Sequence, residues 1–313
     1  MTGRRGAIAR AAGLLGDRVR RGVPLGPMTT YRVGGAAALF LEAASVDDLA
    51  AAATAVAATG VPTLVVGNGS NMLVADAGFD GLAVALGGAF ATVEIDGVRV
   101  RAGGAALLPV VARRTVRAGL TGFEWAVGVP GSIGGAVRMN AGGHGSDMAA
   151  SLVDARVVDL ATAADERRPA RALALDYRRS SVAPAHVVVD ATLSLAPGDR
   201  AAGERAVAEI VAWRRAHQPG GQNAGSVFTN PPGDSAGRLI DAADCKGLRV
   251  GTAEVSARHA NFFQADPGGS ADDVLALMTE VRRRVRERFG VDLHPETRLV
   301  GFDNPRPLPE VEG

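Results

Sequence analysis

The sequence predicts an α+β protein built from two domains. A chain of 313 residues is longer than a single domain with one hydrophobic core usually is. Short apolar runs of strand length and segments with a helical stripe both occur along the chain. A break at Pro197-Gly198-Asp199 separates a first part with two glycine-rich runs from a second part with a different polar pattern. We therefore expect one domain over residues 1–197 and a smaller one over residues 198–302.

The individual elements follow from periodicity, from acidic residues near helix starts and from turn residues. The expected helices cover residues 7–15, 46–58, 107–118, 201–216 and 272–289. The expected strands cover residues 61–66, 82–86, 92–95, 98–101, 152–159 and 186–195. Asp96-Gly97 is a hairpin signal between two of these strands. Residues 303–313 are rich in proline and acidic residues and are expected to be disordered.

Composition excludes several classes of function. Apolar residues make up 47% of the chain and charged residues 21%, as in an ordinary soluble protein. The net charge of +1 gives no field that would attract nucleic acid or an anionic membrane. Lys246 is the one lysine, so an anion clamp in this chain should use arginine, and the lone Cys245 excludes a disulfide framework. Without a signal peptide or a membrane span, the protein is expected in the cytoplasm.

The two glycine-rich runs are the most informative feature. Residues 67–71 follow the predicted strand at 61–66, and residues 128–145 contain seven glycines. Closely spaced backbone N–H groups suit an anion, and two such cradles suggest a cofactor bridged by a diphosphate. Met72 stands where a Rossmann motif needs its third glycine, and the phosphate-binding P-loop lysine is missing. Tight turns are the alternative interpretation of either run alone.

Seven motifs connect the chain to a known family. They are, in order, TYRVGG (30–35), VGNGSNMLV (66–74), GVPGSIGGA (128–136), YRRSS (177–181), NAGSVF (223–228), RHANF (258–262) and LHPE (293–296). Together they closely resemble the UDP-N-acetylenolpyruvoylglucosamine reductases, over about residues 28 to 300. The resemblance implies a two-lobed FAD-binding domain of the vanillyl-alcohol oxidase/p-cresol methylhydroxylase type, with lobes that divide near residue 86. It also implies a smaller α+β substrate-binding domain, of the subtype that lacks an extra tyrosine-bearing loop.

The same resemblance implies FAD as the cofactor, with NADPH as the reductant. Relatives in the wider superfamily attach the flavin through a histidine near the first glycine run, where this chain has Asn71. We therefore expect non-covalent FAD, and we interpret His144 as a surface or lining residue. The expected cofactor-binding residues are Gly67, Asn68, Gly69, Ser70, Asn71, Gly128, Pro130, Gly131, Ser132, Gly134, Gly135, Ala136 and Asn140.

The resemblance assigns the chemistry to three residues. Arg178 is expected to grip the carboxylate of UDP-N-acetylglucosamine enolpyruvate, Ser226 to protonate its α-carbon, and Glu296 to polarise the carboxylate. Singly, each could be an ordinary surface or loop residue. The expected substrate-binding residues are Tyr177, Arg178, Asn230, His259 and Asn261. Thr229 stands where the family often has a lysine, so an arginine or a backbone donor would have to hold the diphosphate.

The resulting hypothesis is a monomeric reductase that makes UDP-N-acetylmuramate for peptidoglycan, without nucleic acid, membrane or metal partners. Two alternatives stay open. One is another flavin oxidase of the superfamily, reoxidised by oxygen, although aromatic residues are 4% of the chain and the attachment histidine is absent. The other is a flavin- or nucleotide-sugar-binding module without turnover, against which the presence of Arg178, Ser226 and Glu296 argues.

Overall fold

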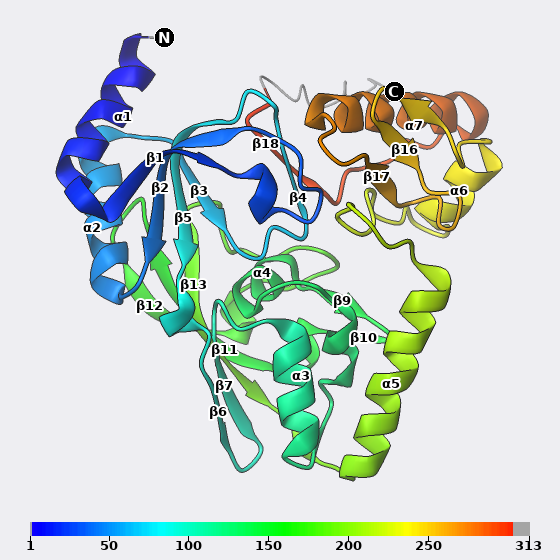
Figure 1. Ribbon diagram of the computed structural model, residues 1–313. Helices are drawn as coiled ribbons and strands as arrows, with labels where there is room; N and C mark the ends of the chain where they lie inside the picture. The colour runs from blue at the N-terminus through cyan, green and yellow to red at the C-terminus, as the bar shows by residue number, and fades with distance from the viewer. Residues whose placement is uncertain (1, 303–313) are drawn as a thin grey trace. The chain divides into compact units, whose positions relative to one another are not determined.

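The computed structural model describes residues 2–302, so the tail at 303–313 lies outside the described residues. Helices and strands are mixed along the chain, which agrees with the predicted α+β class (Figure 1). Contacts divide the described residues into two compact units. Unit 1 comprises residues 2–21, 39–69 and 81–217, and unit 2 comprises residues 22–38, 70–80 and 218–302. No helix among the described residues is long and apolar enough to cross a membrane.

The first core of unit 1 lies between two helices and a sheet. Helix α2 begins with a capping box in which Ser45 and Asp48 bond each other's backbone, and it ends at Gly60 with φ 64°. Buried leucines and alanines of α1, α2 and the sheet share one hydrophobic cluster. The sheet has the order β1-β2-β5-β3, with β3 parallel to β5. The elements are α1 (Thr2–Leu15), β1 (Val19–Pro24), β2 (Ala36–Ala43), α2 (Val46–Thr59), β3 (Thr63–Val66) and β5 (Phe79–Leu86).

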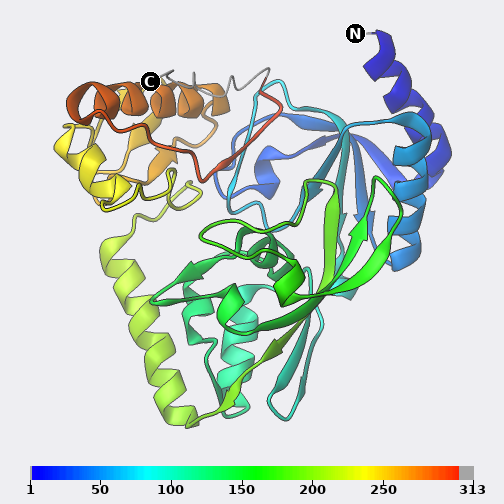
Figure 2. The same cartoon turned by 180° about the vertical axis from the view of Figure 1, so that it is seen from behind.

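The second core of unit 1 is built on a five-stranded sheet of order β12-β11-β13-β7-β6, in which neighbouring strands are antiparallel (Figure 2). Phe123 and Trp125 meet edge to face in its hydrophobic cluster. The strands are β6 (Val93–Asp96), β7 (Arg99–Gly103), β11 (Leu152–Asp159), β12 (Asp165–Pro169) and β13 (His186–Ser194). Around them lie α3 (Leu108–Arg117), α4 (Ile133–Met139), α5 (Arg200–His217) and the short pairs β8 (Leu120–Thr121) with β14 (Ala196–Pro197) and β9 (Gly142–Gly143) with β10 (Ser146–Asp147).

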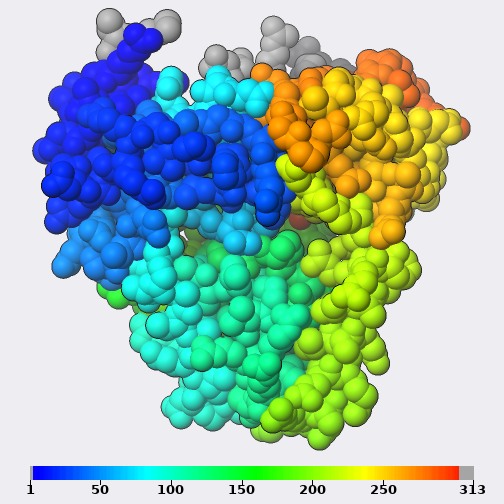
Figure 3. Space-filling model, in the orientation of Figure 1, coloured from blue at the N-terminus to red at the C-terminus, as the bar shows by residue number. Residues whose placement is uncertain are grey.

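Helix α5 belongs to unit 1, although the break near residue 197 was expected to open the second domain. The reason is packing. A Cβ on Gly203 would lie 2.9 Å from Cγ1 of Val116 in α3, so the two helices approach too closely for a larger residue. Val207, Ile210 and Val211 of α5 pack against the second core of the unit. In the space-filling view the side chains of α5 close against their neighbours in the unit (Figure 3).

Unit 2 joins two N-terminal segments to the C-terminal part of the chain. Strand β4 (Met72–Val74) pairs in parallel with β18 (Arg298–Val300). Tyr31 and Leu73, both 0% exposed, are in the same hydrophobic cluster as Phe228 and Phe263. The remaining elements are α6 (Ala236–Ala242), β15 (Arg249–Val250), β16 (Ala253–Val255), β17 (Phe263–Ala265) and α7 (Ala271–Phe289), with β15-β16-β17 forming an antiparallel sheet. The functional assignment of the two domains stays a prediction.

Asp76 fastens the 70–80 segment to the start of α7. Its carboxylate accepts hydrogen bonds from Ser270 Oγ (2.6 Å), Ala271 N (3.0 Å) and Asp272 N (3.3 Å). The N–H groups of a first helical turn lack partners within the helix, and the helix dipole favours an anion there.

Asp76→Ala is therefore expected to lower the free energy of unfolding by about 0.5–2 kcal/mol, because it removes the carboxylate that accepts from the start of the helix. Urea unfolding followed by circular dichroism measures the change. Asp80→Ala is the matched control, since Asp80 is an exposed aspartate four positions further along. Equal stabilities of the two variants would contradict this account of Asp76.

Candidate active site

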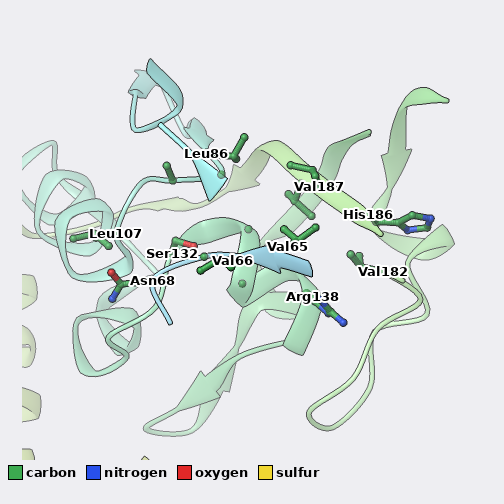
Figure 4. Close-up of a pocket in the computed structure, with 16 residues that line it drawn as sticks. Val65, Val66, Asn68, Leu86, Leu107, Ser132, Arg138, Val182, His186 and Val187 are labelled. Atoms are coloured by element: carbon green, nitrogen blue, oxygen red, sulfur yellow. The ribbon is translucent and has the colours of Figure 1, made fainter. Parts of the chain in front are cut away.

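A cavity of about 220 Å³ in unit 1 is lined by both glycine-rich runs (Figure 4). Asn68 and Ser132 lie toward one end in this view, and Arg138 and His186 toward the other. The walls between them are largely apolar. The lining residues are Val65, Val66, Gly67, Asn68, Leu86, Gly104, Ala105, Leu107, Ser132, Gly134, Gly135, Arg138, Val182, His186, Val187 and Val188.

The two runs are held against each other and against the neighbouring backbone. Asn68 donates its side-chain N–H to the carbonyl of Pro130. A Cβ on Gly67 would lie 3.0 Å from Ser132 Oγ, and one on Gly104 only 2.0 Å from the Val188 carbonyl oxygen. Glycine is needed at residue 104 because the Val188 main chain leaves no room for a side chain, whereas at residue 67 a side chain would meet the Ser132 hydroxyl. The pocket is therefore a closely packed junction of backbone segments with an apolar interior.

The second run offers fewer free N–H groups than the sequence suggests. Gly134 N donates to the Gly104 carbonyl (2.9 Å), and Ile133 N donates to the Ala106 carbonyl (2.9 Å). Ala136 N is bonded to the Ser132 carbonyl inside helix α4 (2.9 Å). The amides of Ile133 and Gly134 therefore join the run to residues 104–106 of unit 1, whereas that of Ala136 bonds within the run itself.

Residues of the first run are divided between the units. Gly69, with φ 61°, is the last residue of unit 1 in this run, whereas Ser70 and Asn71 belong to unit 2. Within unit 2, Asn71 Nδ2 donates to the backbone carbonyl of Glu296 (3.0 Å), and Arg298 N donates to the Asn71 carbonyl (3.0 Å). Asn71 therefore holds the main chain at a predicted catalytic residue, a contact that the motif alone does not reveal.

Arg178 lies in a tight turn of unit 1. Asp176 and Arg179 pair across the turn through two backbone hydrogen bonds of 3.0 and 3.1 Å. Arg178 adopts a left-handed conformation with φ 56°, which costs roughly 1–2 kcal/mol for a residue other than glycine. Its guanidinium carbon lies 5.3 Å from the centre of the Tyr177 ring. Strained residues of this kind cluster at functional sites, where the surrounding structure keeps them in place.

Ser226 and Glu296 are brought together in unit 2. Residues 226–228 form an extended segment, with Ser226 opposite Phe262 on one side and Phe228 opposite Pro295 on the other. Glu296 N donates to the carbonyl of Val227, the residue after Ser226, at 2.8 Å. Gly225 precedes the serine with φ 76°. The main chain at Glu296 is therefore bonded next to Ser226, although the two residues lie far apart in the sequence.

Two family models match parts of this chain. The family model for the C-terminal domain of UDP-N-acetylenolpyruvoylglucosamine reductase matches residues 217–300, and that of an FAD binding domain matches residues 37–163. A reductase of this name from Rubrobacter xylanophilus is 43% identical over 286 residues, covering 89% of this chain and 94% of the relative. The chain belongs to the UDP-N-acetylenolpyruvoylglucosamine reductase family.

Further relatives support the same membership. The reductase from Heliobacterium modesticaldum is 46% identical over 283 residues and covers 89% of each chain. The solved structure of the Thermus caldophilus reductase superposes with a TM-score of 0.79 at 37% identity, over 90% of this chain and 99% of that one. The predicted family and its FAD-binding fold class are thereby confirmed, and the C-terminal match begins where unit 2 resumes, near residue 217.

The pocket suits FAD, the cofactor named in the family model that matches residues 37–163. Its glycine backbone and the side chains of Asn68 and Ser132 offer polar groups near one end, as a diphosphate would need. Valine and leucine side chains line the remaining walls, which suits an aromatic ring system. Arg138 and His186 also line the cavity but were not among the expected cofactor residues. Only their positions in the fold, not a motif, could have revealed them.

The predicted substrate residues of the reductase have unequal surroundings. Tyr177 is 54% exposed, so its ring is accessible. The Asn230 side-chain oxygen accepts the N–H of Ala236 (3.0 Å) at the start of α6. Burial lowers the pKa of His259, whose Nδ1 accepts the N–H of Asn261 (3.3 Å), as a neutral imidazole can.

The side chain of Asn261 forms hydrogen bonds within the protein. Its side chain is 3% exposed and pairs with both backbone groups of Phe228, accepting from N (3.0 Å) and donating to O (2.8 Å). Both amide functions that were expected to serve the substrate thus form a short ladder with the segment that carries Ser226. The structure gives Asn261 a supporting position beside the site.

A cluster on α5 was missed by sequence reasoning. Arg214 donates to the carbonyl of Gly128 in the second glycine run, and burial lowers the pKa of this arginine. Trp213 stacks on His217 with ring centres 4.7 Å apart and meets His144 edge to face at 5.2 Å. His144 therefore lies at the unit surface against α5, as a surface or lining residue would. The helical stripe predicted α5 but not its contact with the glycine run.

Proposed function

We propose that the chain catalyses the NADPH-dependent reduction of UDP-N-acetylglucosamine enolpyruvate to UDP-N-acetylmuramate. This is a step of peptidoglycan precursor synthesis, and the enzyme would work in the cytoplasm as a monomer with non-covalent FAD. The observation that carries the proposal is the backbone hydrogen bond by which Glu296 N donates to the carbonyl of Val227, the residue after Ser226, in unit 2 of a chain that also has an FAD-binding domain. Named relatives over about nine tenths of the chain support it.

The roles of the residues follow from the charge that develops in the substrate. Bound FAD would supply the hydride, which it receives from NADPH and which the substrate accepts at the β-carbon of its enolpyruvyl group. Negative charge then accumulates at the α-carbon and spreads onto the carboxylate. Arg178 would hold that carboxylate with its planar fork, and Glu296 would polarise it by donating a hydrogen bond when protonated.

Ser226 would supply the proton that completes the reduction. A serine hydroxyl is a weak acid, so it can act only on a strongly basic carbanion held close to it. Segment 226–228 is paired on both sides through its backbone, which fixes the main chain that carries the hydroxyl. Positioning of this kind contributes to a rate because less freedom has to be lost at the transition state.

An anaerobic experiment tests the function. NADPH added to the purified yellow protein should bleach the flavin absorption, and UDP-N-acetylglucosamine enolpyruvate should then restore it without oxygen. Recovery only after air is admitted would point to the oxidase alternative instead. A colourless protein that binds no added FAD would contradict the proposal as a whole. Release of the yellow colour on denaturation should show that the flavin is non-covalent.

A further inference from the structure

Asn140 ends helix α4 immediately after the pocket-lining part of the second glycine run. It is 3% exposed and adopts a left-handed conformation with φ 40°. Its side-chain Nδ2 donates to Asp147 Oδ2 (3.1 Å) and to the backbone carbonyl of Asp176 (3.1 Å). Its Oδ1 accepts the N–H of Ala149 (2.9 Å). A single buried amide thus joins three chain segments of unit 1.

These contacts leave no side-chain donor for a ligand. A primary amide has two N–H groups, and both are already bonded to protein oxygens. Asn140 was expected to bind the cofactor, and a diphosphate would require a donor from it. The structure therefore directs the amide toward Asp176, the residue that opens the turn carrying Arg178.

The other side of the same turn is fastened to the same helix. Ser180 Oγ donates to the carbonyl of Arg138 in the last turn of α4 (2.7 Å) and accepts the N–H of Val182 (3.2 Å). The turn is thus held at Asp176 before Arg178 and at Ser180 after it. Both anchors end on residues 138 and 140, next to the part of α4 that lines the pocket.

We propose that Asn140 is a positioning residue that fixes the Arg178 turn relative to the pocket-lining helix α4. The inference rests on the proposed function, in which Arg178 holds the substrate carboxylate. Arg178 has the unfavourable φ of 56°, which is maintained by the backbone pairing of Asp176 with Arg179 and by the two contacts with α4. Without the bond to Asp176 the turn can relax and move the guanidinium, and a displacement of about 1 Å can slow a reaction up to a hundredfold.

Asn140→Gly is the informative variant, because glycine accepts the left-handed backbone while the amide is removed. We expect flavin content and flavin reduction by NADPH to stay within about twofold of wild type. Reoxidation by the enolpyruvyl nucleotide should slow at least about tenfold. Ser180→Ala removes the second contact with α4 and should slow reoxidation a few fold. It replaces Asn140→Gly as the test if that variant folds poorly. Ser181→Ala is the matched control, since its hydroxyl bonds the Ala172 carbonyl instead (3.2 Å).

Two further measurements separate positioning from a general structural role. Amide hydrogen exchange should accelerate in peptides covering residues 174–182 of Asn140→Gly and stay unchanged in strand β11. In an Arg178→Ala background, Asn140→Gly should slow reoxidation by less than about a further twofold. The reason is that the effects of two substitutions are not additive when one residue acts through the other. Equal slowing of both half-reactions, or full additivity, would overturn the proposal. If Arg178→Ala is reoxidised at the wild-type rate, the proposed role of Arg178 is overturned as well. If Arg178→Ala is slow but Asn140→Gly is as fast as wild type, only the present proposal is overturned.

Discussion

Replacing Ser226 by alanine is expected to leave flavin reduction by NADPH intact and to slow product formation by at least about a hundredfold. The size follows from the contribution of a positioned general acid, which is typically 10²- to 10⁴-fold. The hydroxyl is removed from an extended segment that is paired with Phe262 and, through Val227, with Glu296. Because these pairings use backbone groups, the variant should keep the local structure.

Stopped-flow absorbance of the two half-reactions measures this effect directly. Ser226→Cys keeps a proton and should recover part of the lost rate. Ser235→Ala is the control, since it removes another serine hydroxyl of unit 2, one that caps α6 by accepting the N–H of Arg238 (3.2 Å). Equal loss of both half-reactions in Ser226→Ala would show that the serine supports the fold rather than the protonation.

The fold was predictable where local signals agree. Helix α2 has a capping box and a glycine end, and α7 has an apolar stripe, so both begin and end within one residue of the sequence prediction. Helix α4 was missed because two glycines follow Ile133 and lower its helix propensity. It forms because Ile133 and Val137 are fully buried in the second core of unit 1.

The composition of the units could not be predicted from local patterns. Residues 22–38 and 70–80 join unit 2 through contacts with residues some 200 positions away. Tyr31 is buried there, β4 pairs with β18, and Asp76 bonds the start of α7. The periodicity of a short sequence window cannot predict such pairing, because the pairing depends on tertiary contacts between segments far apart in the sequence. The break at Pro197 is real as the end of β14, but α3 packing keeps the following helix in unit 1.

The candidate site shows a similar division. Motifs identify which residue types are present, and the structure shows which of their polar groups are already bonded. Asn68 and Ser132 line the pocket as expected, although Asn68 also donates to the Pro130 carbonyl. Asn140 and Asn261 donate to main-chain or carboxylate oxygens and are not among the lining residues. Asparagines in a motif look alike in sequence because their partners are set by tertiary contacts. The difference is one of position in the fold, because Ser132, at 4% exposure, is about as buried as Asn140 and Asn261 at 3%.

Asn261→Ala is therefore expected to destabilise the protein strongly, by about 2–6 kcal/mol. Its amide satisfies both the N–H and the C=O of Phe228, and each buried backbone group left unpaired costs about 1–3 kcal/mol. Phe228 itself is 1% exposed, so water does not replace the lost partner without opening the core. The segment that carries Ser226 would keep its backbone pairings with Phe262 and Pro295 but lose this side-chain contact, and turnover should fall together with stability.

Thermal unfolding of the flavin-loaded protein measures the stability change, which should exceed about 5 °C. Asn261→Asp should also destabilise, since it keeps the acceptor for Phe228 N but turns a carboxylate oxygen toward the Phe228 carbonyl. Asn223→Ala is the matched control, because its amide bonds only nearby loop groups at residues 220, 221 and 225. If Asn261→Ala is stable and loses only substrate affinity, the expectation from the motif, that Asn261 binds the substrate, would hold instead.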